Sequence, residues 1–200
     1  MRRALVFLAL LGAALMLPAR PASAHPLGNF TVNQFSGIVV RPGAVDVEVV
    51  VDMAEIPTFQ TRVDIDTDGD GHVSPAEAAA YRERGCSDLT GGLALQVDGR
   101  PQRLGVRSGA VSFPPGQAGL PTLRLRCDLE ARTGERAGGG PGRVTFANTN
   151  FADRVGWREI TAAGEGVRLV ASDVPVHSTS HRLTRYPDDL LQSPLDQRHA

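Results

Sequence analysis

The sequence predicts a mainly β protein, a β-sandwich-like domain that carries a short α-helical, EF-hand-like insertion. Short runs rich in Val and Leu recur along the chain, and about seven of them have the length and apolar spacing of strands. Gly and Pro are abundant, at 22 and 14 residues, whereas aromatic residues make up only 5%. One acidic segment with helix-forming flanks interrupts the strands and predicts the insertion at about residues 56–85.

The chain begins with the features of a signal peptide. Arg2 and Arg3 precede an apolar run at residues 4–17, and Ala22-Ser23-Ala24 provides a small-residue cleavage site at the end of residues 1–24. The run is too short to span a bilayer comfortably. We therefore expect an exported protein, extracellular or at the cell surface.

The predicted domain covers residues 25–173. Its strands are expected at residues 30–40, 45–52, 93–97, 101–106, 120–130, 143–147 and 166–171. Arg41-Pro42-Gly43 and Asp98-Gly99 have the composition of turns between strands. Residues 174–200 lose the strand alternation and are rich in Ser, Pro and charge, so we expect a linker or an exposed tail there.

The chain has two cysteines, Cys86 and Cys127. In an exported protein an even number of cysteines favours a disulfide. The bond would tie the end of the inserted helix to the strand at residues 120–130. A reactive thiol pair is the alternative, but the spacing is not that of a CxxC motif.

The acidic segment from Asp66 to Glu77 matches the EF-hand calcium-loop pattern D-x-[DN]-x-[DN]-G-x5-E at each specified position. Calcium prefers about six to eight oxygen ligands, and Gly71 stands where the loop must turn sharply. We expect one Ca²⁺ ion. Its predicted ligands are the side chains of Asp66, Asp68, Asp70, Ser74 (directly or through water) and Glu77 (both oxygens), and the carbonyl of His72. The alternative is a solvated Asp- and Gly-rich turn.

The flanks of the loop have helix signals. Ser74, Pro75 and Glu77 form the N-cap, first position and third position of a predicted helix over residues 76–84, which Gly85 would end. Residues 56–64 predict a shorter entering helix. No second loop of this kind occurs in the sequence, so the usual pairing of two loops is not expected.

Histidines provide a second, weaker set of candidate ligands. Cleavage after residue 24 would make His25 the mature N-terminus, where its amine and imidazole together could chelate Ni²⁺ or Co²⁺; a flexible terminus is the alternative. His177 and His181 lie four residues apart, a spacing that suits a metal only on a helix. The Ser- and Thr-rich stretch around them has a weak helix signal, so we expect no site there.

Other classes of function have little support in the sequence. The formal net charge of −1 gives no electrostatic footprint for nucleic acid. No catalytic constellation stands out, and we expect a protein that is not an enzyme. The segment 148–160, with the single Trp157, is either a polar and aromatic binding surface or a packed corner of the domain.

Five segments together resemble a known family. They are His25–Asn33 (HPLGNFTVN), Asp52–Gln60 (DMAEIPTFQ), the loop Asp66–Glu77, Asn150–Ile160 (NFADRVGWREI) and Tyr186–Asp196 (YPDDLLQSPLD). They resemble the extracytoplasmic N-terminal region of actinobacterial nickel/cobalt transporter-like membrane proteins. The resemblance covers nearly all of the chain after residue 24.

This resemblance implies a polytopic transport domain in the same or a neighbouring chain, with membrane tethering through a region that follows Ala200. These 200 residues contain no apolar run long enough to span a bilayer, so transport itself is not expected of them. The expected function is a structural or regulatory calcium-binding module beside a nickel/cobalt transporter. The alternative is an extracytoplasmic domain that captures nickel or cobalt through His25 and other histidines.

Overall fold

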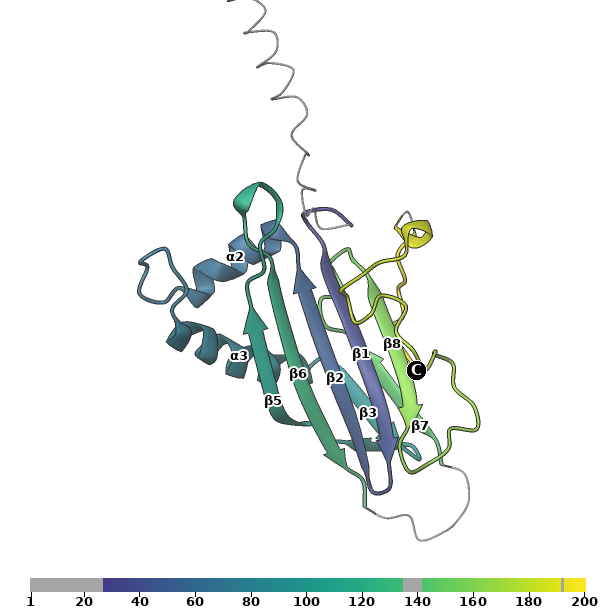
Figure 1. The fold of residues 1–200 in the computed structure, drawn as a ribbon. Coiled ribbons are helices and arrows are strands. Elements are labelled where there is room, and N and C mark those ends of the chain that lie inside the picture. The colour runs from purple at the N-terminus through teal and green to yellow at the C-terminus, as the bar shows by residue number, and fades with distance from the viewer. Residues whose placement is uncertain (1–26, 135–141, 192) are drawn as a thin grey trace, which may run out of the picture.

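The computed structural model describes residues 27–134, 142–191 and 193–200. This part of the chain is mainly β, with two α-helices and two sheets (Figure 1), so the mainly β class is confirmed. The predicted signal peptide at residues 1–24 and the candidate ligand His25 lie outside the described residues. Within the described ranges, no helix has both the length and the apolar character needed to cross a membrane.

The larger sheet has five strands in the order β5-β6-β2-β1-β8. Its members are β1 (Val32–Arg41), β2 (Ala44–Met53), β5 (Gly105–Ser112), β6 (Leu123–Arg132) and β8 (Arg158–Gly164). A tight turn at Pro42 and Gly43 joins β1 to β2, with Gly43 at φ 72°. Neighbouring strands are antiparallel, except that β8 runs parallel to β1.

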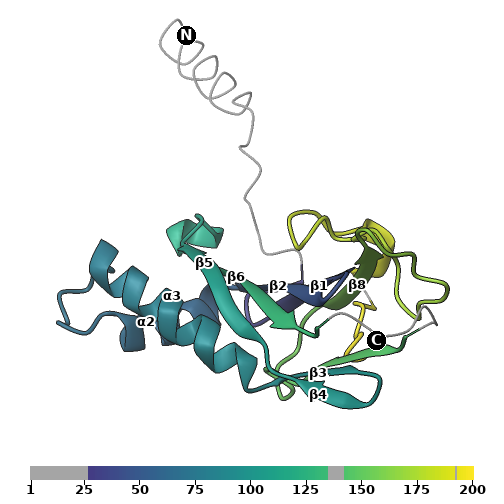
Figure 2. The ribbon, with the colours of Figure 1, turned by 90° about the horizontal axis from the view of Figure 1, so that it is seen from below.

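The smaller sheet has three antiparallel strands in the order β4-β3-β7, with β3 at Leu93–Val97, β4 at Arg100–Gln102 and β7 at Val144–Asn148. Figure 2 shows this sheet and the helices on one side of the five-stranded sheet. The main core lies between these layers, where alternate residues of β2 and β6, such as Val47, Val49 and Leu125, meet Leu95 and Phe146. Burial of this apolar surface is the main force that holds the layers together.

Two helices connect β2 to β3. The first, α2 (Glu55–Ile65), leads into the acidic loop, and α3 (Pro75–Thr90) leaves it. Helix α3 continues past Gly85, where we predicted its end. A Cβ on Gly85 would lie 3.0 Å from the side chain of Leu125, so this glycine allows the helix to pack closely on the sheet.

The predicted disulfide is confirmed: Cys86 on α3 is bonded to Cys127 on β6. Both residues are buried in the core. Gly109 on the neighbouring strand β5 makes room for this bond, since a Cβ there would lie 2.7 Å from Sγ of Cys86. The bond therefore fixes the C-terminal half of α3 against β5 and β6.

Two strand predictions were wrong. Residues 166–171 form no strand, whereas Arg158–Gly164, in the segment considered as a binding surface or corner, forms β8. Its pairing with β1 joins residues more than 120 positions apart, as in Gln34 with Arg158. The single strand expected at 101–106 is instead the end of β4 and the start of the longer strand β5.

We predicted a linker or an exposed tail at residues 174–200. The described part of this segment, residues 174–191 and 193–200, instead packs along the edges of both sheets. The backbone of β8 is bonded to Pro175, Leu195 and Gln197, and Phe146 on β7 is bonded to Ala200. Ser180 and Leu183 are buried. The segment differs from an exposed tail because the open edge of β8 offers backbone groups that this segment satisfies.

Candidate metal site

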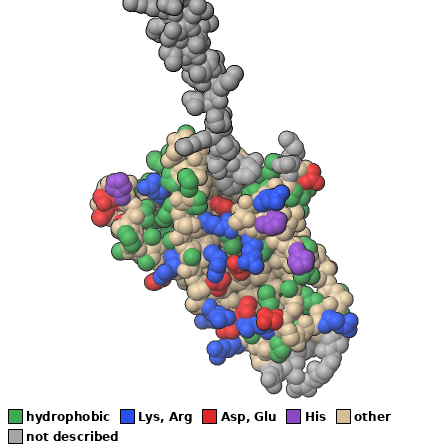
Figure 3. Space-filling model, in the orientation of Figure 1, with side chains coloured by type: hydrophobic (Ala, Val, Ile, Leu, Met, Phe, Trp, Pro, Cys, Tyr) green, Lys and Arg blue, Asp and Glu red, His purple; other side chains and the backbone are tan. Residues whose placement is uncertain are grey.

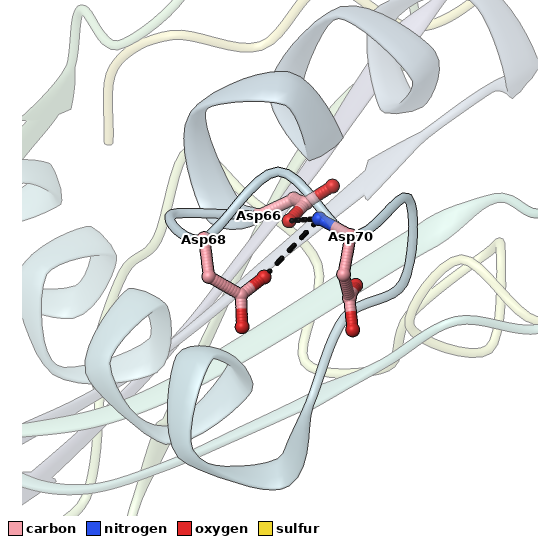
Figure 4. Close-up of side chains that lie close together, drawn as sticks. All are labelled: Asp66, Asp68 and Asp70. Carbon is pink, nitrogen blue, oxygen red and sulfur yellow. Dashed lines mark hydrogen bonds between the residues drawn. The ribbon is translucent and has the colours of Figure 1, made fainter.

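The acidic loop joins the last residue of α2 to the first residue of α3. Asp66, Asp68 and Asp70 each place a carboxylate oxygen within 4.8 Å of the others (Figure 4). Asp68 and Asp70 are exposed, and Asp66 is half-buried. Within the described residues, these three form the one group of three or more His, Cys, Asp or Glu side chains close enough to share an ion.

Backbone N–H groups of the loop hold the aspartates in place. The Asp66 carboxylate accepts hydrogen bonds from Gly69, Asp70 and Gly71, at 2.8, 3.1 and 2.8 Å. Gly69 and Gly71 have φ values of 73° and 82°, in the left-handed region that glycine adopts without the steric cost of a Cβ. The sequence therefore folds the loop around Asp66 through contacts that span no more than five residues.

Glu77 is the second centre of hydrogen bonding in the loop, and it does not belong to the aspartate cluster. Its Oε1 accepts from the backbone N–H of Thr67 at 2.6 Å and from the Thr67 hydroxyl at 2.9 Å. Its Oε2 accepts from the N–H and hydroxyl of Ser74, both at 2.9 Å. Glu77 thus ties the two ends of the loop together.

These hydrogen bonds favour the ionised form of the carboxylate. The N–H of Ser74 is the largest cause, followed by the N–H and hydroxyl of Thr67, and together they lower the pKa of Glu77 to about 2. Glu77 therefore carries its negative charge at neutral pH. A fourth carboxylate stands beside the three aspartates, although its oxygens are directed to loop donors.

The other two predicted ligands, Ser74 and His72, differ in their surroundings. The hydroxyl of Ser74 accepts from the N–H of Glu77 at 3.3 Å and completes the capping box that begins α3. His72 is exposed, and its N–H donates to Asp70 at 2.7 Å. The structure thus clusters the three aspartates and uses Ser74 and Glu77 to shape the loop around them.

The loop is anchored to the core at both ends. Ile65, directly before Asp66, is fully buried, and Val73 packs against the same core. Arg62 on α2 donates to the carbonyl of Gly71 at 3.3 Å. These anchoring residues lie outside the acidic turn. The core therefore fixes the two ends of the loop while the aspartates stay accessible to solvent.

The two histidines spaced four residues apart, His177 and His181, do not form a site with other ligands. His177 and His181 are both exposed, and neither belongs to a metal-binding group within the described ranges. His181 also adopts a positive φ of 49°, so the helical spacing that would place it beside His177 is absent.

Sequence reasoning missed the role of Glu159, a fully buried residue on β8. Its carboxylate accepts from Nε1 of Trp157 at 3.0 Å, from the backbone of Thr179 and Ser180, and from the Ser180 hydroxyl. Trp157 is also fully buried, so this segment is a packed corner of the domain. A Glu two residues after the single Trp was the only signal in the sequence.

Comparisons with protein-family models, with curated proteins and with solved structures found no match. The resemblance to the transporter-like proteins therefore stays a prediction. What the site can do follows from its own residues: three clustered carboxylates with an additional ionised carboxylate nearby can hold a hard cation.

Proposed function

We propose that this chain is an exported calcium-binding module in which residues 55–90 act as a single EF-hand-type unit inserted into a β-sandwich-like domain. The observation that carries the proposal is the cluster of Asp66, Asp68 and Asp70 on a loop whose backbone is already folded around Asp66. Because hydrogen bonds already hold the loop backbone in this turn, less conformational entropy is lost in ordering the backbone when an ion binds.

The donor set favours calcium over other cations. The ligands are oxygens, which exclude the soft and borderline metals that select thiolate or imidazole. Magnesium requires near-ideal octahedral geometry and dehydrates reluctantly, whereas calcium accepts an irregular oxygen cage. Asp66, Asp68 and Asp70 would bind by side chain, His72 by its carbonyl, and Ser74 directly or through water.

Glu77 would complete the cage by rotating its carboxylate from the donors of Thr67 and Ser74 toward the ion. This rotation exchanges hydrogen bonds for a bidentate contact, so part of the binding energy is offset. A single loop also lacks the stabilising contacts that a second, paired calcium loop would make with it. We therefore expect weak binding, with a Kd of roughly 10⁻⁴ to 10⁻³ M, typical of extracellular modules.

The proposed role is structural or regulatory, beside a nickel/cobalt transporter domain in the same or a neighbouring chain. The resemblance of the five sequence segments supports this association. The test is the coding sequence downstream of Ala200 and in the neighbouring genes. Several apolar spans of about 20 residues there would support it, and their absence in both places would contradict it.

Calcium binding can be tested directly by calorimetry and by thermal unfolding, with calcium or with a chelator. At ten times Kd, calcium should stabilise the wild-type fold by about 1.4 kcal/mol, or roughly 3–6 °C in Tm. Glu77→Gln should lose this shift, because Gln can keep the capping box but cannot supply the bidentate charge. Glu83→Gln, on the exposed side of the same helix, is the matched control.

Two results would contradict the proposal. Absence of binding heat and of a calcium-dependent Tm shift in the wild type would make the loop an acidic turn. Nickel binding that survives saturating calcium and the Glu77→Gln change, but is lost when the mature amine is blocked, would favour the capture of nickel through His25.

A further inference from the structure

A groove with a volume of about 640 Å³ lies on the face of the five-stranded sheet that points away from the main core. Its floor is made of short side chains on the neighbouring strands β1 and β8, where Gly37 pairs with Thr161 and Val39 pairs with Ala163. The segment that follows β8 stands along one side of this floor, through residues 176–178. Grooves of this size can hold a small molecule.

Charged side chains of both signs line the groove, and Figure 3 shows such side chains interspersed over this face of the molecule. They are the carboxylates of Asp46, Glu48 and Asp128 and the guanidinium groups of Arg107, Arg126 and Arg182. Because the two signs are equal in number, an ion of a single sign gains little net attraction from the groove. A ligand that carries both charges can instead pair with each of them.

Two of the three carboxylates are already held by short contacts. Asp46 lies 2.5 Å from Nη2 of Arg41. Asp128 accepts hydrogen bonds from Arg126 at 2.9 Å and from Ser108 at 2.5 Å. The hydrogen-bonding capacity of these two carboxylates is therefore largely used within the sheet.

Glu48 and Arg182 are held less firmly. Oε2 of Glu48 lies 3.4 Å from Nε of Arg182, and its Oε1 lies 3.6 Å from Nε of Arg126. Both distances exceed the length of about 2.7–2.9 Å that is typical of a charge-assisted hydrogen bond. Within the described residues, the side chains of Glu48 and Arg182 make no hydrogen bond. The groove thus presents an unused carboxylate directly beside an unused guanidinium group.

The backbone fixes the position of this guanidinium group. Arg182 has a φ of 59°, in the left-handed region, and its carbonyl accepts a hydrogen bond from Arg124. Leu183, the next residue, is buried against Phe35 and Val50 on the same face of the sheet. The turn is therefore ordered without a ligand, which lowers the entropic cost of binding one.

We propose that this groove binds a free α-amino acid with an apolar side chain. An α-amino acid carries its ammonium and carboxylate groups on one carbon atom, and this spacing matches the adjacent side chains of Glu48 and Arg182. Glu48 would accept from the ammonium group and Arg182 would donate to the carboxylate, so that charge-assisted hydrogen bonds replace the 3.4 Å contact. A peptide carries its two terminal charges on different residues and matches this pair less well.

The rest of the groove suits an apolar side chain. Val39, Ala163 and Val176 line it, and Val176 is 57% exposed. The ring of Phe35 lies over Gly37, where a Cβ would be 3.0 Å from the ring. An apolar side chain placed here would remove this surface from water. No residue of the acidic loop lines the groove, so binding should be independent of calcium.

Calorimetry on the full chain tests the assignment. L-Leucine, L-valine, L-methionine and L-phenylalanine are titrated singly, in calcium and in chelator. At least one of them should bind saturably at millimolar concentrations or below, with the same affinity in both conditions. Analogues that lack only the carboxylate or only the ammonium group, such as 3-methylbutylamine and 4-methylpentanoate for leucine, should bind more weakly by about tenfold or more.

Variants locate the site. Glu48→Gln and Arg182→Gln should each weaken binding by about tenfold, because each removes one charge that the ligand pairs with. Glu165→Gln and Arg185→Gln are the matched controls, since both residues are exposed and neither lines the groove. Ala163→Leu fills the floor without a change of charge and should abolish binding, so the test does not depend on the charge variants alone. Unchanged thermal unfolding verifies that each variant is folded.

Absence of binding heat for all four amino acids would overturn the proposal. Binding that is unchanged in Glu48→Gln, Arg182→Gln and Ala163→Leu would do the same, as would equal binding of the amine and acid analogues. Equal binding of L-leucyl-L-leucine would show that the groove takes peptides and would also overturn it. Loss of calcium binding in Glu77→Gln should leave the affinity for the amino acid unchanged, so this inference and the proposed calcium function can fail separately.

Discussion

Glu77 and Glu159 are both carboxylates that collect several hydrogen bonds, but they organise the chain over different distances. The partners of Glu77 lie at residues 67–74, within ten positions of it. Those of Glu159 include Thr179 and Ser180, 20 and 21 positions later. The first carboxylate closes a loop, and the second fixes a distant segment onto β8.

The segment that Glu159 fixes contains an unusual turn. His181, Arg182 and Leu183 have φ values of 49°, 59° and 64°, a left-handed conformation that costs about 1–2 kcal/mol per residue. Such a turn persists only where surrounding contacts over-determine it. Ser180, bonded to Glu159, accepts the N–H of Leu183, and Arg124 donates to the carbonyls of Arg182 and Leu183. The acidic loop around Glu77 needs no such support from distant segments, because its hydrogen bonds join residues that are close in the chain.

The largest expected effect comes from removing the disulfide. The Cys86→Ala/Cys127→Ala protein should lose about 4 kcal/mol of unfolding free energy, because the bond closes a separation of 41 residues. Since the partners of Glu77 are all local, the calcium Kd should change by less than about threefold. Urea unfolding and calorimetry measure the two quantities. A loss of calcium binding in a variant that is still folded would show that the loop depends on the sheet.

The next largest effect should follow Glu159→Gln. The amide would place its own N–H groups against the N–H and O–H donors of Trp157, Thr179 and Ser180. The free energy of unfolding should therefore fall by about 3 kcal/mol. Proteolysis should become faster within residues 177–186. Exposed Glu165→Gln is the control, for which neither quantity should change. Equal protease sensitivity in both variants would mean that other contacts hold the left-handed turn.

A smaller effect is expected from calcium itself. Wild type and Glu159→Gln should show the same calcium-dependent rise in Tm, whereas Glu77→Gln should show none. This outcome would establish that the two carboxylates act independently. Thermal unfolding at millimolar calcium and in chelator measures the calcium-dependent rise in Tm of each variant. If Glu159→Gln lost this rise, the calcium loop would depend on the segment that Glu159 holds.

The smallest effect concerns the second anchor of the C-terminal segment. The hydrogen bond from Arg198, together with the charges of Arg158 and Arg198, holds the pKa of Asp196 below its usual range. A lowered folded-state pKa stabilises the fold above the unfolded pKa of about 4 and loses this contribution as pH falls. Because Asp196 is 54% exposed, Asp196→Asn should cost only about 0.5 kcal/mol at pH 7.

At pH 3 the difference between Asp196→Asn and wild type should shrink toward zero, as measured by urea unfolding at both pH values. A cost that stays constant between pH 3 and pH 7 would mean that Asp196 acts through packing rather than through its charge.

The sequence by itself determined the features that rest on local interactions. The β1–β2 hairpin, the capping box of Ser74 and Glu77, and the glycine positions of the acidic loop all depend on residues close together in the chain. The pairing of Cys86 with Cys127 was also predictable, because only two cysteines are present. For the hairpin, the capping box and the loop, neighbouring residues alone favour one conformation. For the disulfide, two cysteines allow only one pairing within the chain.

Only the tertiary structure decided the rest. Gly85 resembles a helix end, but packing against Leu125 keeps it inside α3. The strand β8 and the course of residues 174–200 depend on an open strand edge that β1, far away in the sequence, creates and positions. The same holds for the partners of Glu159. These features depend on which distant segments hydrogen-bond to each other's backbone groups and bury each other's apolar surfaces. Local propensity does not determine that pairing.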